Sequence, residues 1–243
     1  MANEFREWWH ELSRNYKSGN PEIISFILIR RTLGVLGISL PAVLYVGARL
    51  FAHGCKLQPS ISHYYYTNMR EVFVGVMWAF SLFLFTYKGY SRLDSWAANL
   101  AGLFCLGVAM FPTNFLCGYP CQAKVVYPVE TQYHTIIHFT CATLFFLILA
   151  AISGFLFTKT NPDEEPTLPK KVRNRIYRVC AIVMALSLAM IGAGFFIFHM
   201  SDTNPLVFWC ETAALLSFGI SWLTKGEMLF PDPPIKERLS TNP

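Results

Sequence analysis

The sequence predicts an all-α membrane protein, a polytopic bundle of six transmembrane helices with both termini in the cytoplasm. Of its 243 residues, 53% are hydrophobic and only 14% are charged, whereas about 25% of the residues in a soluble domain are charged. A helix needs about 20 apolar residues to cross the hydrocarbon core, and six stretches meet or nearly meet this length. They lie near residues 32–52, 70–88, 95–113, 133–158, 178–200 and 206–225.

The first span is preceded by Arg30 and Arg31, so the apolar residues 23–29 upstream are expected to form a separate short helix. With Trp8 and Trp9, this helix is expected to lie along the membrane surface, because tryptophan-bearing amphipathic segments bind at the interface. The chain is accordingly divided into a cytoplasmic tail with an interfacial helix, a membrane domain and a second cytoplasmic tail, at residues 1–31, 32–230 and 231–243.

Lysine and arginine residues set the predicted orientation. With six spans, the two tails and the connections after the second and fourth spans share one side, which carries 16 of the 20 basic residues. Connections rich in lysine and arginine stay in the cytoplasm. We therefore attribute the net charge of +5 to the orientation of the chain in the membrane, and no nucleic-acid partner is expected. The expected location is a plasma, inner or endomembrane.

Residues 58–71, before and at the start of the second span, are too polar for a span and too aromatic for an ordinary loop. At least two of the three tyrosines at 64–66 are expected in the interfacial aromatic belt. The other polar groups of this segment, a mixture of hydroxyl, imidazole and guanidinium, suit a phosphate or an ester carbonyl. They belong to Ser60, Ser62, His63 and Arg70.

The fourth span begins with His134 and His138, which are four residues apart and therefore share one helix face. Two imidazoles at this spacing can ligate one metal ion, zinc above all, with His199 as the expected third ligand. Other side chains that can complete the site are His63, Asp202 and Glu211. The alternative is that His134 lies in the wet interface and that His138 hydrogen-bonds to a neighbouring helix.

Glu211 lies within the sixth span, where a carboxylate is costly and normally faces the protein interior or a water-filled cavity. Its depth predicts a pair with Arg70, His138 or His199. A dry pair is structural, whereas a carboxylate that faces a cleft is a candidate acid, base or ligand. Glu211 and Asp202 are thus the candidate catalytic residues.

Three of the seven cysteines, Cys55, Cys117 and Cys121, lie in the predicted outer connections. The compartment there is oxidising, which permits a disulfide. The expected bridge joins Cys117 to Cys121, and Cys55 paired with either of them is the alternative. Free thiols are equally consistent with the sequence.

Four short features, taken together, resemble the six-span DRAM-like family, which includes the damage-regulated autophagy modulators, FRAG-type glycolipid-anchor remodelling proteins and related bacterial proteins. They are Pro59–Ser62, Phe111–Thr113, the run from His138 to Phe146, and Glu211. The resemblance implies a six-helix bundle that handles membrane lipid or glycolipid, and it supplies no catalytic residues. A weaker resemblance, through the HxxxH motif, is to the CREST group of seven-span zinc hydrolases.

These features predict a protein that binds or helps to remodel membrane lipid through a polar cleft at the outer ends of its helices. The predicted ligand-binding residues are His63, Arg70, Glu71, His138, His199 and Glu211, with His134 beside them. One alternative is a zinc-dependent hydrolase or transferase that acts on a lipid ester or amide. Another is a structural or partner-binding membrane protein.

Overall fold

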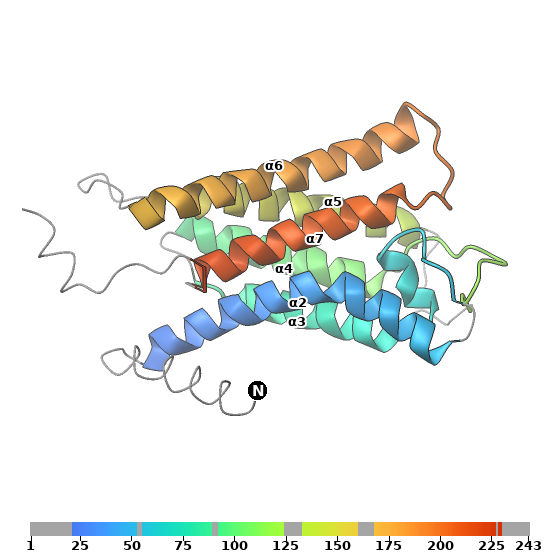
Figure 1. Ribbon diagram of the computed structural model, residues 1–243, viewed down its shortest axis with the longest axis horizontal. Coiled ribbons are helices and arrows are strands. Elements are labelled where there is room, and N and C mark those ends of the chain that lie inside the picture. Colours follow the sequence, from blue (N-terminus) through green and yellow to red (C-terminus); the bar gives the residue numbers. More distant parts are fainter. Residues whose placement is uncertain are drawn as a thin grey trace, which may run out of the picture.

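The computed structural model describes residues 21–52, 55–88, 92–123, 133–159, 168–226 and 228–229. Within these ranges the regular structure is helical, and six α-helices lie side by side in one bundle (Figure 1). Their bounds are α2 Pro21–Phe51, α3 Arg70–Thr86, α4 Arg92–Met110, α5 His134–Ala151, α6 Leu168–Phe196 and α7 Leu206–Lys225. The prediction of an all-α protein is confirmed.

The helices run alternately up and down, and each packs against the next one along the chain. The last helix, α7, returns to pack against α2, so the contacts close into a ring. Aromatic side chains, among them Phe80, Phe218 and Trp222, fill the interior of this ring. The short helix η1 (Ser62–Tyr66) lies at the end of the bundle where α2, α4 and α6 terminate. We refer to this end as the η1 end.

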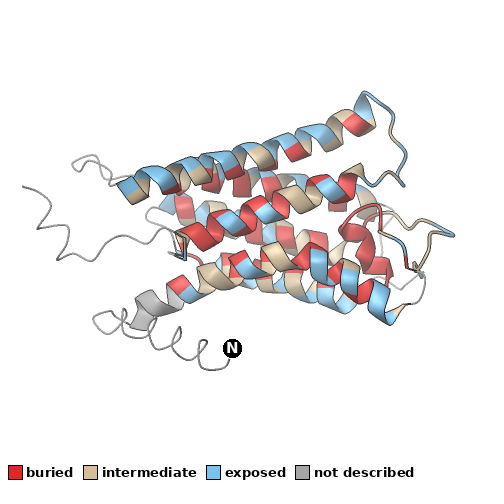
Figure 2. Cartoon of the chain, in the orientation of Figure 1, coloured by how far each residue is buried: buried red, intermediate tan, exposed pale blue. Residues whose placement is uncertain are grey.

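Five of the helices are long and apolar enough to cross a membrane. The other predicted span, α3, has 17 residues, which corresponds to about 26 Å of helix. Large apolar side chains are exposed along the helices, for example Val43 on α2 and Leu186 on α6, and exposed residues follow their outer faces (Figure 2). Such a surface matches lipid rather than water. The chain is an integral multi-pass membrane protein.

Two helices begin at least ten residues earlier than the sequence predicts, and α4 begins three residues earlier. α2 runs without a break from Pro21, so residues 23–29 belong to the helix of the first span and not to a separate one. The charged side chain of Arg31 has a hydrogen-bond partner in this position: its Nε donates at 2.8 Å to the carbonyl of Gly226, the residue after α7. α6 begins at Leu168 rather than at residue 178, so its basic first turns continue the helix beyond the apolar stretch. Trp8 and Trp9 lie outside the described residues.

Two glycines allow the backbones of α2 and α7 to touch. A Cβ atom placed on Gly219 would lie 2.6 Å from the Gly34 carbonyl oxygen and 2.5 Å from Cγ1 of Ile38. Small residues permit this close approach, which is a common basis of helix association within membranes. The α2–α7 contact that closes the ring therefore depends on the absence of a side chain at Gly219.

We expect Gly219→Ala to lower the thermal stability of the detergent-solubilised protein. The added methyl group would clash with the backbone of α2 at Gly34, and relieving the clash requires the two helices to move apart. Overpacking of this kind costs about 1–3 kcal/mol. Gly192→Ala on α6 is the matched control, since a Cβ there meets nothing within 4 Å. Equal melting temperatures for the two variants would contradict the assignment.

Candidate functional site

The connection between α2 and α3 folds back into the bundle at the η1 end. Its central part is the 3₁₀ helix η1 (Ser62–Tyr66), all of whose residues are buried. The three tyrosines are at most 1% exposed, so the prediction that at least two of them belong to the aromatic belt is wrong. Neighbouring segments cover them: the Tyr66 hydroxyl donates to the Thr113 carbonyl, and the Tyr64 ring packs against Phe208.

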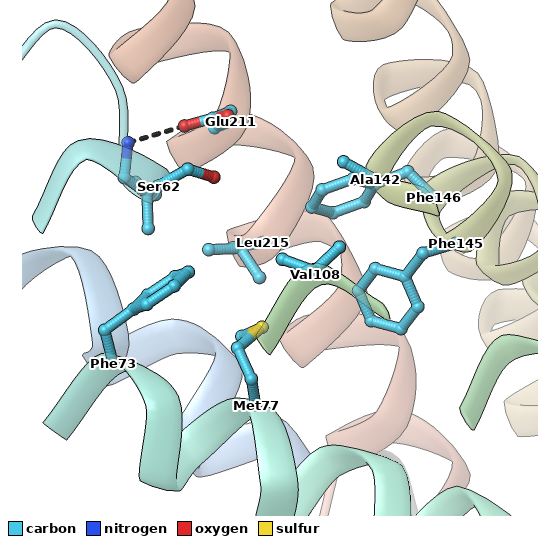
Figure 3. Close-up of a pocket in the computed structure, with 10 residues that line it drawn as sticks. Ser62, Phe73, Met77, Val108, Ala142, Phe145, Phe146, Glu211 and Leu215 are labelled. Carbon is cyan, nitrogen blue, oxygen red and sulfur yellow. Dashed lines mark hydrogen bonds between the residues drawn. The ribbon is translucent and has the colours of Figure 1, made fainter. Parts of the chain in front are cut away.

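Glu211, on the second turn of α7, holds the start of η1 in place. Its Oε2 atom accepts a hydrogen bond from the backbone N–H of Ile61, with 2.6 Å between the two atoms (Figure 3). The first N–H groups of a helix have no partner inside the helix and favour a negative charge. The partner of Glu211 is thus a backbone amide and not one of the expected side chains, Arg70, His138 and His199.

A small cavity of about 30 Å³ lies next to this hydrogen bond. Figure 3 shows Glu211 and Ser62 on one side of it and apolar side chains such as Phe73, Met77 and Leu215 around the rest. One water molecule in the liquid takes about 30 Å³. The cavity is therefore too small for a lipid head group or an acyl chain.

His63 forms a buried pair with Ser60. The Ser60 Oγ atom lies 2.6 Å from His63 Nδ1, and it also accepts the backbone N–H of His63 at 3.2 Å. Burial, and to a smaller extent the neighbouring His138, lowers the pKa of His63 to about 4. The imidazole is therefore neutral at physiological pH and belongs to the packed interior.

His138 is also buried, at 2% exposed, and its Nδ1 lies 2.7 Å from the Phe111 carbonyl oxygen at the end of α4. This is the alternative that the sequence left open, in which His138 bonds to a neighbouring segment. His134 stands one helical turn before it, at the first residue of α5, as the HxxxH spacing predicts. The Phe111 carbonyl at the broken end of a helix needs a donor, and the imidazole supplies it.

His199 and Asp202 lie on the turn between α6 and α7. Asp202 accepts a hydrogen bond from Asn114 Nδ2 at 2.9 Å, and His199 is exposed with a positive φ of 48°. Across the described residues, no three His, Cys, Asp or Glu side chains are grouped so that they can hold a metal ion. The zinc site of His134, His138 and His199 stays a prediction that this geometry does not support.

A larger groove opens between α3 and α4 at the η1 end, with a volume of about 330 Å³. Charged residues lie at one end of the lining, where α3 begins, and apolar residues continue along α3, opposite the last two residues of α4. The lining consists of Tyr65, Arg70, Glu71, Val74, Gly75, Trp78, Ala109 and Met110. Arg70 and Glu71 are the two predicted ligand-binding residues that the structure brings together in an open site.

The Arg70 side chain is held against η1. Its guanidinium carbon lies 4.8 Å from the centre of the Tyr65 ring, and its Nη2 donates to the Tyr65 hydroxyl at 3.1 Å. Among the described residues, its Nε atom is buried without a hydrogen-bond partner. A fixed guanidinium with a spare donor is suited to a phosphate or a carboxylate.

Sequence reasoning missed the apolar part of this groove. Glu71, Gly75 and Trp78 follow one another at intervals of four and three residues, so they share a helix face with the charged start of α3. That periodicity is the signal that identifies the groove. A Cβ added at Gly75 would meet nothing within 4 Å, which keeps the groove open at this point.

The three cysteines outside the helices are free thiols, which is the alternative to a bridge that the sequence left open. Cys117 is exposed, whereas Cys55 is buried and its Sγ lies 3.9 Å from Nε2 of Gln58, an amide that also bonds to Pro120 and Gln122 on either side of Cys121. Both neighbours of Cys121 are thus tied to the connection that contains Cys55, and the disulfide itself stays a prediction.

Comparison with known proteins gives one finding. A family model described as a protein of unknown function (DUF998) matches residues 61–224. No curated protein and no solved structure matches the chain. The matched region begins at the residue whose N–H binds Glu211 and includes η1 and the helices α3 to α7 almost to the end of α7.

We expect Glu211→Ala to destabilise the protein by about 1–3 kcal/mol, because the buried N–H of Ile61 loses its acceptor. Glu211→Gln should cost less, since its amide oxygen can still accept this hydrogen bond. Thermal unfolding in detergent measures both changes. A Glu211→Ala variant as stable as the wild type would show that the carboxylate does not hold η1.

His63 should make stability depend on pH. Its pKa falls from 6.5 to about 4 in the folded protein, so between these values the unfolded chain takes up a proton that the folded chain does not. The contribution is complete above pH 6.5 and is lost as the pH falls towards 4, with a size on the order of 3 kcal/mol. Melting temperatures between pH 4 and pH 7.5 should fall less steeply for His63→Gln. Identical slopes would contradict the shift.

Proposed function

The chain belongs to the DUF998 family, whose function is not known, and we propose that it binds a membrane phospholipid in the groove between α3 and α4. One observation carries this proposal. The groove joins a fixed guanidinium, that of Arg70, to an apolar lining that continues along the helices towards Trp78. A phospholipid has the same two parts in the same order, a phosphate and then acyl chains.

Arg70 is the proposed phosphate ligand. The stack on Tyr65 fixes the plane of the guanidinium, and the buried Nε atom is a donor that still needs an acceptor. Hydrogen bonds from a guanidinium to a phosphate are charge-assisted and often bidentate. Glu71, exposed beside it, can accept a hydrogen bond from an ammonium or hydroxyl group of the head group.

The apolar lining is the proposed acyl-chain site. Val74, Trp78 and Met110 offer side chains on both walls, and the missing side chain of Gly75 leaves a channel between them. Trp78 is 41% exposed, so the groove opens sideways to the membrane. A lipid can therefore enter from the bilayer without crossing the packed interior of the bundle.

The distribution of lysine and arginine supports a location for this groove in the outer leaflet, because the cytoplasmic side carries most of these residues. The resemblance to DRAM-like proteins supports a role in the handling of membrane lipid or glycolipid. Both points extend the proposal and neither is needed for the binding itself.

The test is native mass spectrometry of the detergent-purified protein with phosphatidylglycerol, beside diacylglycerol of the same chain length, which lacks the phosphate. We expect Arg70→Gln to weaken phosphatidylglycerol binding about tenfold or more, since hydrogen bonds to charged groups contribute about 1.5–3 kcal/mol. Diacylglycerol binding should not change in this variant.

Gly75→Leu tests the acyl site, because its Cβ meets nothing within 4 Å and the rest of the side chain would occupy the groove. It should reduce the binding of both lipids. Gly192→Leu on α6 adds the same side chain where a Cβ also meets nothing, and it should leave binding unchanged. Wild-type affinity in both Arg70→Gln and Gly75→Leu would rule out this groove as the lipid site.

A further inference from the structure

Two connections that are distant in sequence lie against each other at the η1 end. Residues 55–58 follow α2 and residues 119–123 follow α4, and side-chain hydrogen bonds join them. Gln58 Nε2 donates to the Pro120 carbonyl at 3.0 Å, and the Tyr119 hydroxyl donates to the Leu57 carbonyl at 2.9 Å. The two segments are therefore held together by bonds that do not involve the cysteines.

Further bonds continue the contact on both sides. Gln122 Nε2 donates to Gln58 Oε1 at 3.0 Å, and the backbone N–H of Ala123 donates to the Tyr66 carbonyl at 2.8 Å. The second of these reaches the last residue of η1. The pair of connections thus forms one layer that covers η1.

Cys55 and Cys121 face each other within this layer. Cys55 Sγ accepts a weak bond from Gln58 Nε2 at 3.9 Å, and the same amide group bonds to Pro120 and Gln122, which are the two neighbours of Cys121. Cys55 is only 3% exposed, whereas Cys121 is half-buried and can be reached from solvent. Cys117 is exposed in the turn just before Cys121.

We propose that Cys55 and Cys121 form a disulfide when a disulfide oxidant, such as oxidised glutathione, reaches the η1 end. The Gln58 amide, which contacts Cys55 and bonds to both neighbours of Cys121, holds the two cysteines in one layer before the bridge forms. This proposal does not depend on the lipid groove.

The reaction takes place in two exchange steps. The thiolate of the accessible Cys121 attacks one sulfur of the oxidant, which forms a mixed disulfide and releases one reduced thiol. Cys55 then loses its proton and attacks the Cys121 sulfur, which forms the bridge and releases the second thiol. The two cysteines lose two electrons and two protons, and the oxidant gains them. Burial raises the pKa of the Cys55 thiol to about 12, so Cys55 acts as the second, resolving thiol.

The bridge would close a loop between residues that are 66 positions apart in the sequence. A disulfide of this span stabilises the folded protein mainly because it restricts the unfolded chain. It would also tie the connection that leads into η1 to the connection that follows α4.

The test uses the reduced full-length protein in detergent, treated with oxidised glutathione, alkylated under denaturing conditions and digested for mass spectrometry. We expect two fewer alkylated cysteines than in the untreated sample, and a cross-linked peptide pair that contains Cys55 and Cys121 and lacks two hydrogen atoms. Cys117→Ser should keep this pair, and Cys121→Ser should lose it. The melting temperature should rise on oxidation in the wild type and in Cys117→Ser, but not in Cys55→Ser.

A bridge between Cys117 and Cys121 in the wild type would overturn the proposal. Full alkylation of all seven cysteines after the oxidant treatment would do the same. Because these readouts are chemical, loss of lipid binding in an Arg70 variant has no bearing on them.

Discussion

The hydrogen bond from the Ile61 backbone N–H to the Glu211 carboxylate decides the architecture of the η1 end. Polar backbone groups at the end of a membrane bundle need internal partners wherever water is excluded. A 3₁₀ helix of five residues supplies few of them by itself. α7 is the last helix along the chain, and it provides the acceptor. The segment that carries His63 and Tyr65 is therefore positioned by a residue far away in sequence.

The polar residues gathered at this end have two different roles, which are set by the direction of each side chain. His63 and His138 point into the interior and are bonded to Ser60 and to the Phe111 carbonyl. These bonds satisfy the two Nδ1 atoms, which would otherwise be costly to bury, whereas Nε2 of His63 is buried without a hydrogen-bond partner among the described residues. Arg70 lines the open groove instead. Both groups lie at the same end of the bundle, so position along the bundle alone does not separate the buried residues from those that line the groove.

Apolar length made the helices predictable, and α7 has the predicted bounds, 206–225. The starts of α2 and α6 were missed because helices continue into the basic segments beyond the hydrocarbon core, where charge does not end them. The HxxxH spacing correctly placed two imidazoles one turn apart. It could not show that the Phe111 carbonyl engages one ring, because this contact is tertiary. The burial of the tyrosines at 64–66 depends likewise on contacts between helices.

The groove and the proposed disulfide meet at η1, through different bonds. Tyr65 stacks on Arg70 and so fixes the guanidinium before any ligand arrives, which reduces the entropy that binding must overcome. Tyr66, the next residue, is held through its carbonyl by Ala123, in the connection that contains Cys121. A covalent link at Cys121 would therefore restrain the same short helix that orients Arg70. In the proposed lipid site, the fixed position of η1, and not the number of polar groups around it, is what gives the Arg70 guanidinium its selectivity.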